Sequence, residues 1–226
     1  MWEERRCKVR NLWPGLLAVG ILAYRLRGRG RQLAWGSTEE EARGLQPGDE
    51  LLASPDLVAT RAITIETPAE RVWPWIAQLG QGRGGFYSYD LVENLIGCDI
   101  HSAHRIMAHW QGIAVGDEVR LAPQVGLRVA AVETGRALVL LGAVPMGDIT
   151  PPYSFTWAFV LRPEPDGRTR LIVRERYAYT RWWAPLMIEP VTAVSFVMTR
   201  KMLRGIKRRA ERQSHRPAHG RMEAKS

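Results

Sequence analysis

From Asp117 onward, apolar and polar residues alternate with a period of two, which is typical of strands that bury one face. Gly, Pro and Asp turns divide this alternation into five predicted strands. The strands are expected at residues 117–121, 127–133, 136–141, 153–162 and 169–180. A shorter alternating run at residues 60–66 predicts one further strand ahead of them.

Three segments have the signals of helices. They are expected at residues 68–79, 89–96 and 190–213. Thr67 and Glu70 have the spacing of a capping box, with Pro68 at the first helical position of the first helix. Gly97 is the expected end of the second helix. The third is the longest, and its apolar residues recur at helical spacing.

Gly80, Gly82 and Gly85 reproduce the spacing of the dinucleotide-binding motif G-x-G-x-x-G. In that motif the glycines follow a strand and open a helix, because the pyrophosphate binds at the helix N-terminus. Here they close the helix predicted over residues 68–79, so the order is reversed. We interpret them as a turn out of a helix and expect no cofactor.

An antiparallel sheet with one apolar face needs a cover, and the long last helix is the element able to supply it. The order of elements therefore predicts an α+β, helix-grip fold. In this fold a curved antiparallel sheet wraps around a long C-terminal helix, two short helices follow the first strand, and a cavity remains between sheet and helix. We expect residues 35–213 to form this domain, residues 1–34 to form an anchoring or docking segment with a linker, and residues 214–226 to form a basic disordered tail.

Several motifs resemble the START-like, polyketide-cyclase superfamily (SRPBCC), in particular bacterial members of unassigned activity. They include TPAERVWPW at residues 67–75 and QLGQGRGGFYSY at residues 78–89, with shorter matches at residues 62–65, 93–94, 115–117 and 169–171. The resemblance covers about residues 35–210 and is specific for the fold. Superfamily members bind lipids, sterols and polyketides, and a few cyclise or dehydrate them. The resemblance therefore implies a hydrophobic small-molecule ligand.

The positive charge of the chain is concentrated at its two ends. Of the formal net charge of +9, residues 1–35 carry +6 and residues 200–226 carry +8, which leaves −5 for the middle. A nucleic-acid-binding domain would place Lys and Arg on its folded face, so we expect no nucleic-acid partner. The two cysteines, Cys7 and Cys98, are too few for a disulfide framework and favour a reducing compartment.

Residues 12–24 form an uncharged apolar stretch between clusters of basic residues. A comfortable bilayer span takes about 20 residues, but flanking arginines that reach the interface allow a shorter one. We therefore expect membrane contact through residues 12–24, with the folded domain in the cytoplasm. The alternatives are a helix docked on the domain and a soluble cytoplasmic protein. The oligomeric state is left open.

The strand at residues 169–180 alternates arginines with apolar residues and Glu175. If Arg170, Arg174 and Arg176 face solvent, Glu175 faces the cavity together with Tyr177. A carboxylate among apolar side chains serves either general acid–base chemistry or a structural ion pair with an inward arginine. Glu175 and Tyr177 are therefore the catalytic candidates.

The expected ligand-binding residues come from the first helix, the glycine-rich loop, two strands and the last helix. They are Trp73, Arg83, Phe86, Tyr87, Trp157, Phe159, Glu175, Tyr177, Val194 and Met198. Such a cavity favours a binder of a hydrophobic small molecule. The alternative is a cyclase or dehydratase that uses Glu175 with a cavity tyrosine as an acid–base pair. In that case Glu175→Gln would abolish turnover of a polyketone and leave binding intact.

Arg83 is the one cation in the glycine-rich loop of residues 80–85. We predict that this loop folds over a mouth of the cavity and that Arg83 donates to Glu93, to Glu175 or to a carbonyl. With a buried carboxylate as partner, Arg83→Ala would cost about 3–5 kcal/mol. The histidines at positions 101, 104 and 109 lack the H-E-x-x-H context and a strong third ligand, so no metal is expected.

Overall fold

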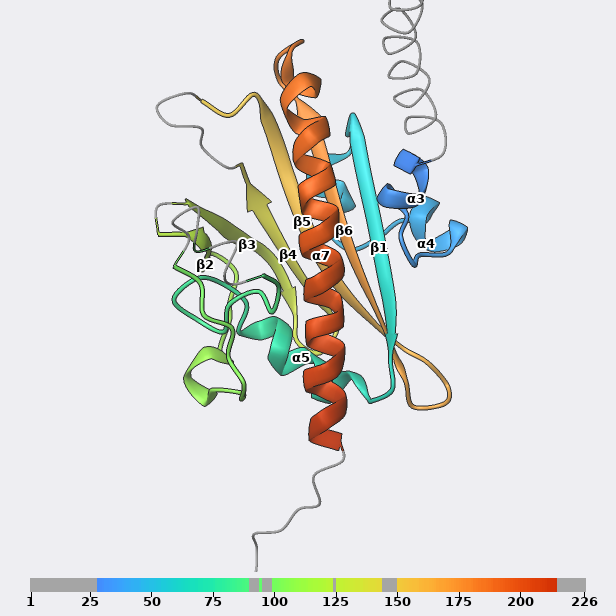
Figure 1. Ribbon diagram of the computed structural model, residues 1–226, viewed down its shortest axis with the longest axis vertical. Coiled ribbons are helices and arrows are strands. Elements are labelled where there is room, and N and C mark those ends of the chain that lie inside the picture. The colour runs from blue at the N-terminus through green and yellow to red at the C-terminus, as the bar shows by residue number, and fades with distance from the viewer. Residues whose placement is uncertain (1–27, 90–93, 95–98, 124, 144–149, 215–226) are drawn as a thin grey trace, which may run out of the picture.

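The computed structural model describes residues 28–89, 94, 99–123, 125–143 and 150–214 of the 226-residue chain. A curved sheet lies behind one long helix, and shorter helices flank it (Figure 1). The strands are β1 (Leu57–Ile65), β2 (Glu118–Ala122), β3 (Val125–Glu133), β4 (Ala137–Gly142), β5 (Tyr153–Pro163) and β6 (Thr169–Tyr179). The helices are α3 (Arg29–Leu33), α4 (Glu39–Arg43), α5 (Ala69–Ala77) and α7 (Ala184–Ser214), with 3-10 turns η2 (Asp49–Leu52) and η3 (Ala108–Trp110).

The sheet has six strands in the order β1-β6-β5-β4-β3-β2, and all neighbours are antiparallel. Every connection except that between β1 and β2 joins neighbouring strands, while the first strand pairs with the last. In this register Glu175 of β6 lies between Ala59 of β1 and Trp157 of β5. The predicted α+β, helix-grip fold is confirmed.

The core lies between the inner face of the sheet, α5 and α7. Large apolar side chains from all three are fully buried, among them Ile65, Trp75, Phe159 and Leu203. Burial of one such side chain contributes about 1.5–3 kcal/mol. The stripe of α7 that carries Leu203 is therefore what holds the helix against the sheet.

The starts of two helices differ from the prediction, and a third predicted helix is not tested. The last helix begins at Ala184 rather than at residue 190, so Pro190 lies inside α7. The first helix begins at Ala69, because Pro68 has an extended ψ of 155° and serves as its cap. The second short helix, predicted over residues 89–96, lies outside the described residues apart from Tyr89 and Asn94.

The outer face of the sheet is covered by the segment that contains α4 and η2, and this corrects the expectation of solvent-exposed arginines on β6. Arg174 is only 2% exposed. Its guanidinium donates to Asp49 Oδ2 at 2.5 Å and to the carbonyl oxygen of Glu41 at 2.6 Å. Arg176 also pairs with Asp49, and Arg170 pairs with Glu41. Strand alternation shows which residues share a face, but not which other segment covers it.

Within the described part of the chain, no helix has both the length and the apolar character of a bilayer span. Residues 12–24 and the tail from residue 215 lie outside that part. The helix α3 falls within the stretch predicted as anchoring segment and linker, and it packs against β1 and α7.

Candidate ligand-binding cavity

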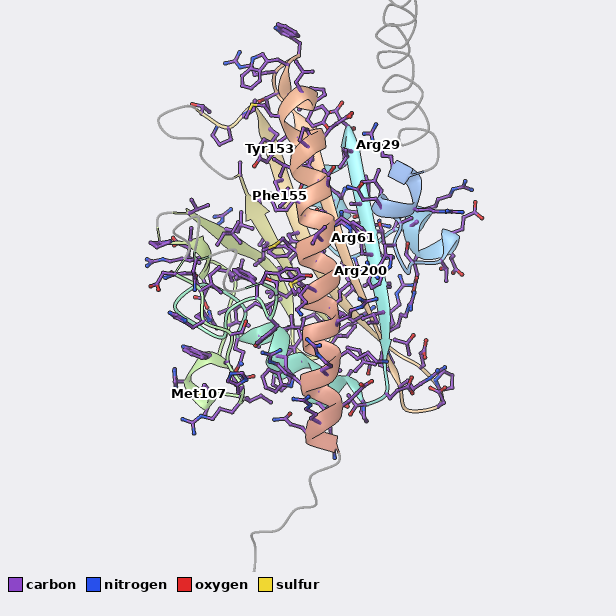
Figure 2. All side chains as sticks on the ribbon, viewed as in Figure 1. Arg29, Arg61, Met107, Tyr153, Phe155 and Arg200 are labelled. Atoms are coloured by element: carbon purple, nitrogen blue, oxygen red, sulfur yellow. The ribbon has the colours of Figure 1, made fainter. Side chains whose placement is uncertain are left out.

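A cavity of about 260 Å³ lies between the inner face of the sheet and α7. Strands β5 and β6 supply an aromatic wall of Tyr153, Phe155, Trp157 and Tyr177, with Glu175 beside them. Figure 2 shows Tyr153 and Phe155 on the upper part of the sheet, at the level of the first half of α7. Strand alternation brings these side chains to one face because positions 153, 155 and 157 share a parity, as do 175 and 177.

The helix α7 supplies the opposite wall. Its contribution is Val191, Ser195, Met198, Thr199 and Met202. Each of these positions has another of the set three or four residues away, so they form one face of the helix. Phe86, Ser88, Ile100 and Leu121 close the remaining side.

Glu175 is the centre of a buried polar network. Its side chain is 3% exposed and pairs with Arg61 Nη1 at 2.8 Å. The hydroxyl of Ser195 lies 2.7 and 2.8 Å from the two carboxylate oxygens, and the hydroxyl of Thr199 lies 3.1 Å from Oε1. The phenolic hydroxyl of Tyr177 donates to Oε2 at 3.2 Å. Both oxygens of Glu175 are thus occupied by donors from β1, β6 and α7.

Arg61 connects this network to the start of the described chain. Its Nε donates to the backbone oxygen of Gln32 in α3 at 3.3 Å, and its guanidinium lies 5.7 Å from the ring centre of Phe196. Within the described residues, Arg61 Nη2 is buried without a hydrogen-bond partner. The inward arginine that pairs with Glu175 is therefore Arg61, whereas Arg83 was one of the partners that the sequence left open.

Tyr177 remains a phenol at neutral pH. Its burial raises the pKa of this hydroxyl well above the usual value, and the nearby negative charge of Glu175 raises it further. A protonated Tyr177 can donate to Glu175, which is the direction the geometry requires.

Five of the ten predicted ligand-binding residues line the cavity. They are Phe86, Trp157, Glu175, Tyr177 and Met198. The other five, Trp73, Arg83, Tyr87, Phe159 and Val194, are not in its wall. Trp73 and Phe159 belong to the packed core, where the Phe159 ring lies 4.8 Å from the ring of Trp157. Val194 is 64% exposed, since it lies on the outward side of α7.

Arg83 and Tyr87 hold the glycine-rich loop against its neighbours instead of facing the cavity. Arg83 Nη2 donates to the backbone oxygens of Ala77 and Trp110, at 2.9 and 2.8 Å. The structure thus gives Arg83 carbonyl partners, from the end of α5 and from η3. The hydroxyl of Tyr87 donates to the backbone oxygen of Trp75 at 3.1 Å. The glycines follow α5, in the order expected of a turn that leaves a helix.

The sequence analysis missed Arg61, Ser195 and Thr199. Arg61 has the same parity as the apolar Ile63 and Ile65 on its strand, which was a signal for an inward charge. The two hydroxyl residues interrupt the apolar stripe of α7, so a search for apolar spacing alone passed over them. Among the described residues, no group of three or more His, Cys, Asp or Glu side chains is arranged to hold a metal ion.

The sequence matches no protein-family model and none of the curated proteins compared with it. Solved structures are similar at low identity. A Mesorhizobium loti protein has 17% identity and a TM-score of 0.42, over 68% of this chain and 97% of its own. The Zhui aromatase/cyclase from Streptomyces sp. R1128 has 13% identity and a TM-score of 0.44, over 73% of this chain and 98% of its own. Norcoclaurine synthase from Thalictrum flavum has 12% identity and a TM-score of 0.44, over 74% of this chain and 92% of its own.

At these identities the likeness concerns the fold alone. The sheet order, the long α7 across the inner face and the cavity between them define a helix-grip domain. The resemblance to the START-like, polyketide-cyclase superfamily stays a prediction from the sequence motifs.

Proposed function

We propose that this protein binds a small, uncharged hydrophobic molecule in the cavity between the sheet and α7. The observation that carries the proposal is the state of Glu175, the one charged residue among the described residues that line the cavity. Its charge is compensated by Arg61, and hydroxyl groups occupy its oxygens. A charged ligand would meet no free counter-charge there, whereas an apolar one gains from displacing water.

The size of the cavity limits the ligand. Its volume of about 260 Å³ lies just below the roughly 300–1,000 Å³ of most small-molecule sites. A small ring system or a short acyl chain fits this space, and a whole phospholipid does not. Met198 and Met202 can change rotamer at little cost, so the cavity adapts to ligands of somewhat different shape.

The acid–base alternative has less support from the geometry. A general base needs a free lone pair within reach of the substrate proton. Both oxygens of Glu175 already accept hydrogen bonds, and Tyr177 is held as a donor to the same carboxylate. These contacts favour a structural role for the pair in a binding protein.

Binding of the uncharged fluorophore N-phenyl-1-naphthylamine tests the proposal. Met198→Trp should fill the cavity and weaken binding at least about tenfold, because the lost contact area is worth more than 1.4 kcal/mol. Val115→Trp adds a similar side chain at a position 63% exposed, outside the cavity, and should leave the affinity unchanged.

Circular dichroism verifies that both variants are folded. Native mass spectrometry of the gently purified protein should also detect a bound apolar molecule. Equal affinity of the Met198→Trp variant and the parent protein would refute the assignment of the cavity.

A further inference from the structure

Exposed apolar side chains lie along the first half of α7 and just before its start. Nine large apolar side chains are well exposed in the described part of the chain, and five of them lie between residues 182 and 197. We call these five the α7 apolar face: Trp182 (88% exposed), Leu186 (75%), Val191 (48%), Val194 (64%) and Val197 (50%). Single exposed apolar residues are ordinary, but a contiguous patch on one helix marks an interaction surface.

The described chain begins close to this face. Arg29, at the start of α3, pairs with Glu189 of α7 at 3.2 Å. A groove lies between them, and Pro185, Leu186 and Pro190 contribute to its walls. Figure 2 shows Arg29 beside the upper half of α7. Tyr24 comes five positions before Arg29 in the sequence, a distance of at most about 18 Å in an extended chain.

We propose that the α7 apolar face docks on an anionic phospholipid bilayer, at the end of the molecule where the described chain begins. Trp182 and Trp183 lie at this end, directly before α7, and tryptophan is enriched at membrane interfaces. The bilayer also suits the charge of the region. Residues 1–35 carry a net charge of +6, which anionic headgroups attract and a second copy of the chain would repel.

Docking in this way would orient the cavity toward lipid. Val191 belongs to the α7 apolar face and also lines the cavity. A ligand dissolved in the bilayer could then enter beside Val191 without crossing water. This route rests on the proposed function, whereas the docking does not.

Nitroxide labels on the full-length chain test the docking. Cysteines are placed singly by Trp182→Cys or Leu186→Cys, in a background with Cys7→Ser and Cys98→Ser. The matched control is Leu45→Cys, because Leu45 is 88% exposed, as Trp182 is, and lies between α4 and η2 on the outer side of the sheet. The vesicles contain equal parts of phosphatidylcholine and phosphatidylglycerol.

With vesicles, the labels at positions 182 and 186 should become severalfold less accessible to a water-soluble relaxation agent and more accessible to oxygen. The label at position 45 should not change. Labels that stay accessible to water would overturn the proposal, whether the chain is bound to the vesicles through residues 12–24 or not bound. Labels already shielded without vesicles would overturn it as well, since residues 12–24 or a second copy would then cover the face.

Dilution distinguishes these two occupants of the face. A second copy dissociates at low protein concentration and exposes the labels, whereas residues 12–24 of the same chain do not. Fluorophore binding without vesicles is measured in parallel. If the fluorophore does not bind, the proposed ligand-binding function is wrong. If the labels stay accessible to water, the proposed docking is wrong. The two failures are therefore distinguishable.

Discussion

Arg61 and Glu175 form an ion pair whose side chains are 1% and 3% exposed. Taking two charges out of water costs several kcal/mol, which their attraction and hydrogen bonds offset only while both are present. The pair therefore adds little net stability compared with two apolar residues. Replacement of only one of the two residues, however, leaves the other as a buried charge without a partner.

Arg61→Met should lower the free energy of unfolding by about 3–5 kcal/mol, because Glu175 loses its counter-charge. A second change, Glu175→Gln, should restore part of the loss. Arg136→Met is the matched control, since Arg136 and its partner Glu133 are 65% and 57% exposed. An exposed pair contributes about 0–1 kcal/mol. Urea unfolding measures all three variants, and equal losses for Arg61→Met and Arg136→Met would contradict the prediction.

At the scale of residues, the sequence predicted the inward carboxylate but not its partner. The parity of β6 placed Glu175 and Tyr177 correctly on the inner face. It could not show which cation lies opposite, because Arg61 is separated from Glu175 by 114 positions in the sequence. A pairing of that kind depends on which strands become neighbours, and no local sequence pattern predicts that β1 pairs with β6.

At the scale of elements, α7 packs closely against the segment that follows the glycine-rich loop of residues 80–85. Gly205 of α7 faces Tyr87, and a Cβ at position 205 would lie 2.3 Å from the Tyr87 backbone oxygen. Backbone cannot move aside as the end of a flexible side chain can. The missing side chain therefore allows the helix and the loop to touch.

Gly205→Ala should destabilise the protein by about 1–3 kcal/mol, since overpacking outweighs the gain in helix propensity of roughly 1 kcal/mol. Gly30→Ala in α3 is the control, because a Cβ there would meet nothing within 4 Å. It should cause no loss of stability. Thermal unfolding compares the two variants, and a Gly205→Ala protein as stable as the parent would show that α7 does not touch this loop.

All six strands were predicted within three residues of their ends, because alternation and turn residues are local signals. The long helix was predicted six residues too short at its start, since Pro190 resembled a first helical position and lies inside the helix instead. The cover of the outer face by α4 and η2 was not predicted. It depends on Glu41 and Asp49 meeting arginines of β6, and such contacts between distant segments leave no periodicity.

For the molecule as a whole, two buried tyrosines contribute to the response of stability to alkaline pH. Burial raises the pKa of Tyr87 and of Tyr177 above the ordinary tyrosine value of 10.0. In both cases the folded protein holds the proton more tightly than the unfolded chain. Their contribution to stability is therefore complete below pH 10 and is lost as the pH rises from there through the folded-state pKa.

The free energy of unfolding should fall above about pH 10 by roughly 1.4 kcal/mol per pH unit for each of these tyrosines. In Tyr177→Phe the slope should be about half as steep, because only Tyr87 remains of the pair. Urea unfolding at a series of pH values measures the slope, and absorbance at the phenolate band shows when the phenols ionise. A stability that stays flat well above pH 10 would disprove the linkage.

The pairing of the first strand with the last also governs when the protein can fold during its synthesis. β1 lies at the edge of the sheet and pairs only with β6 among the described strands, and α7 follows β6. A nascent chain that has not yet released Thr169–Tyr179 from the ribosome therefore has no partner for β1 and no counter-charge for Arg61. Sheets built on such distant contacts form slowly. The domain can therefore complete its sheet only after Thr169–Tyr179 has left the ribosome, and its core only after α7 has followed.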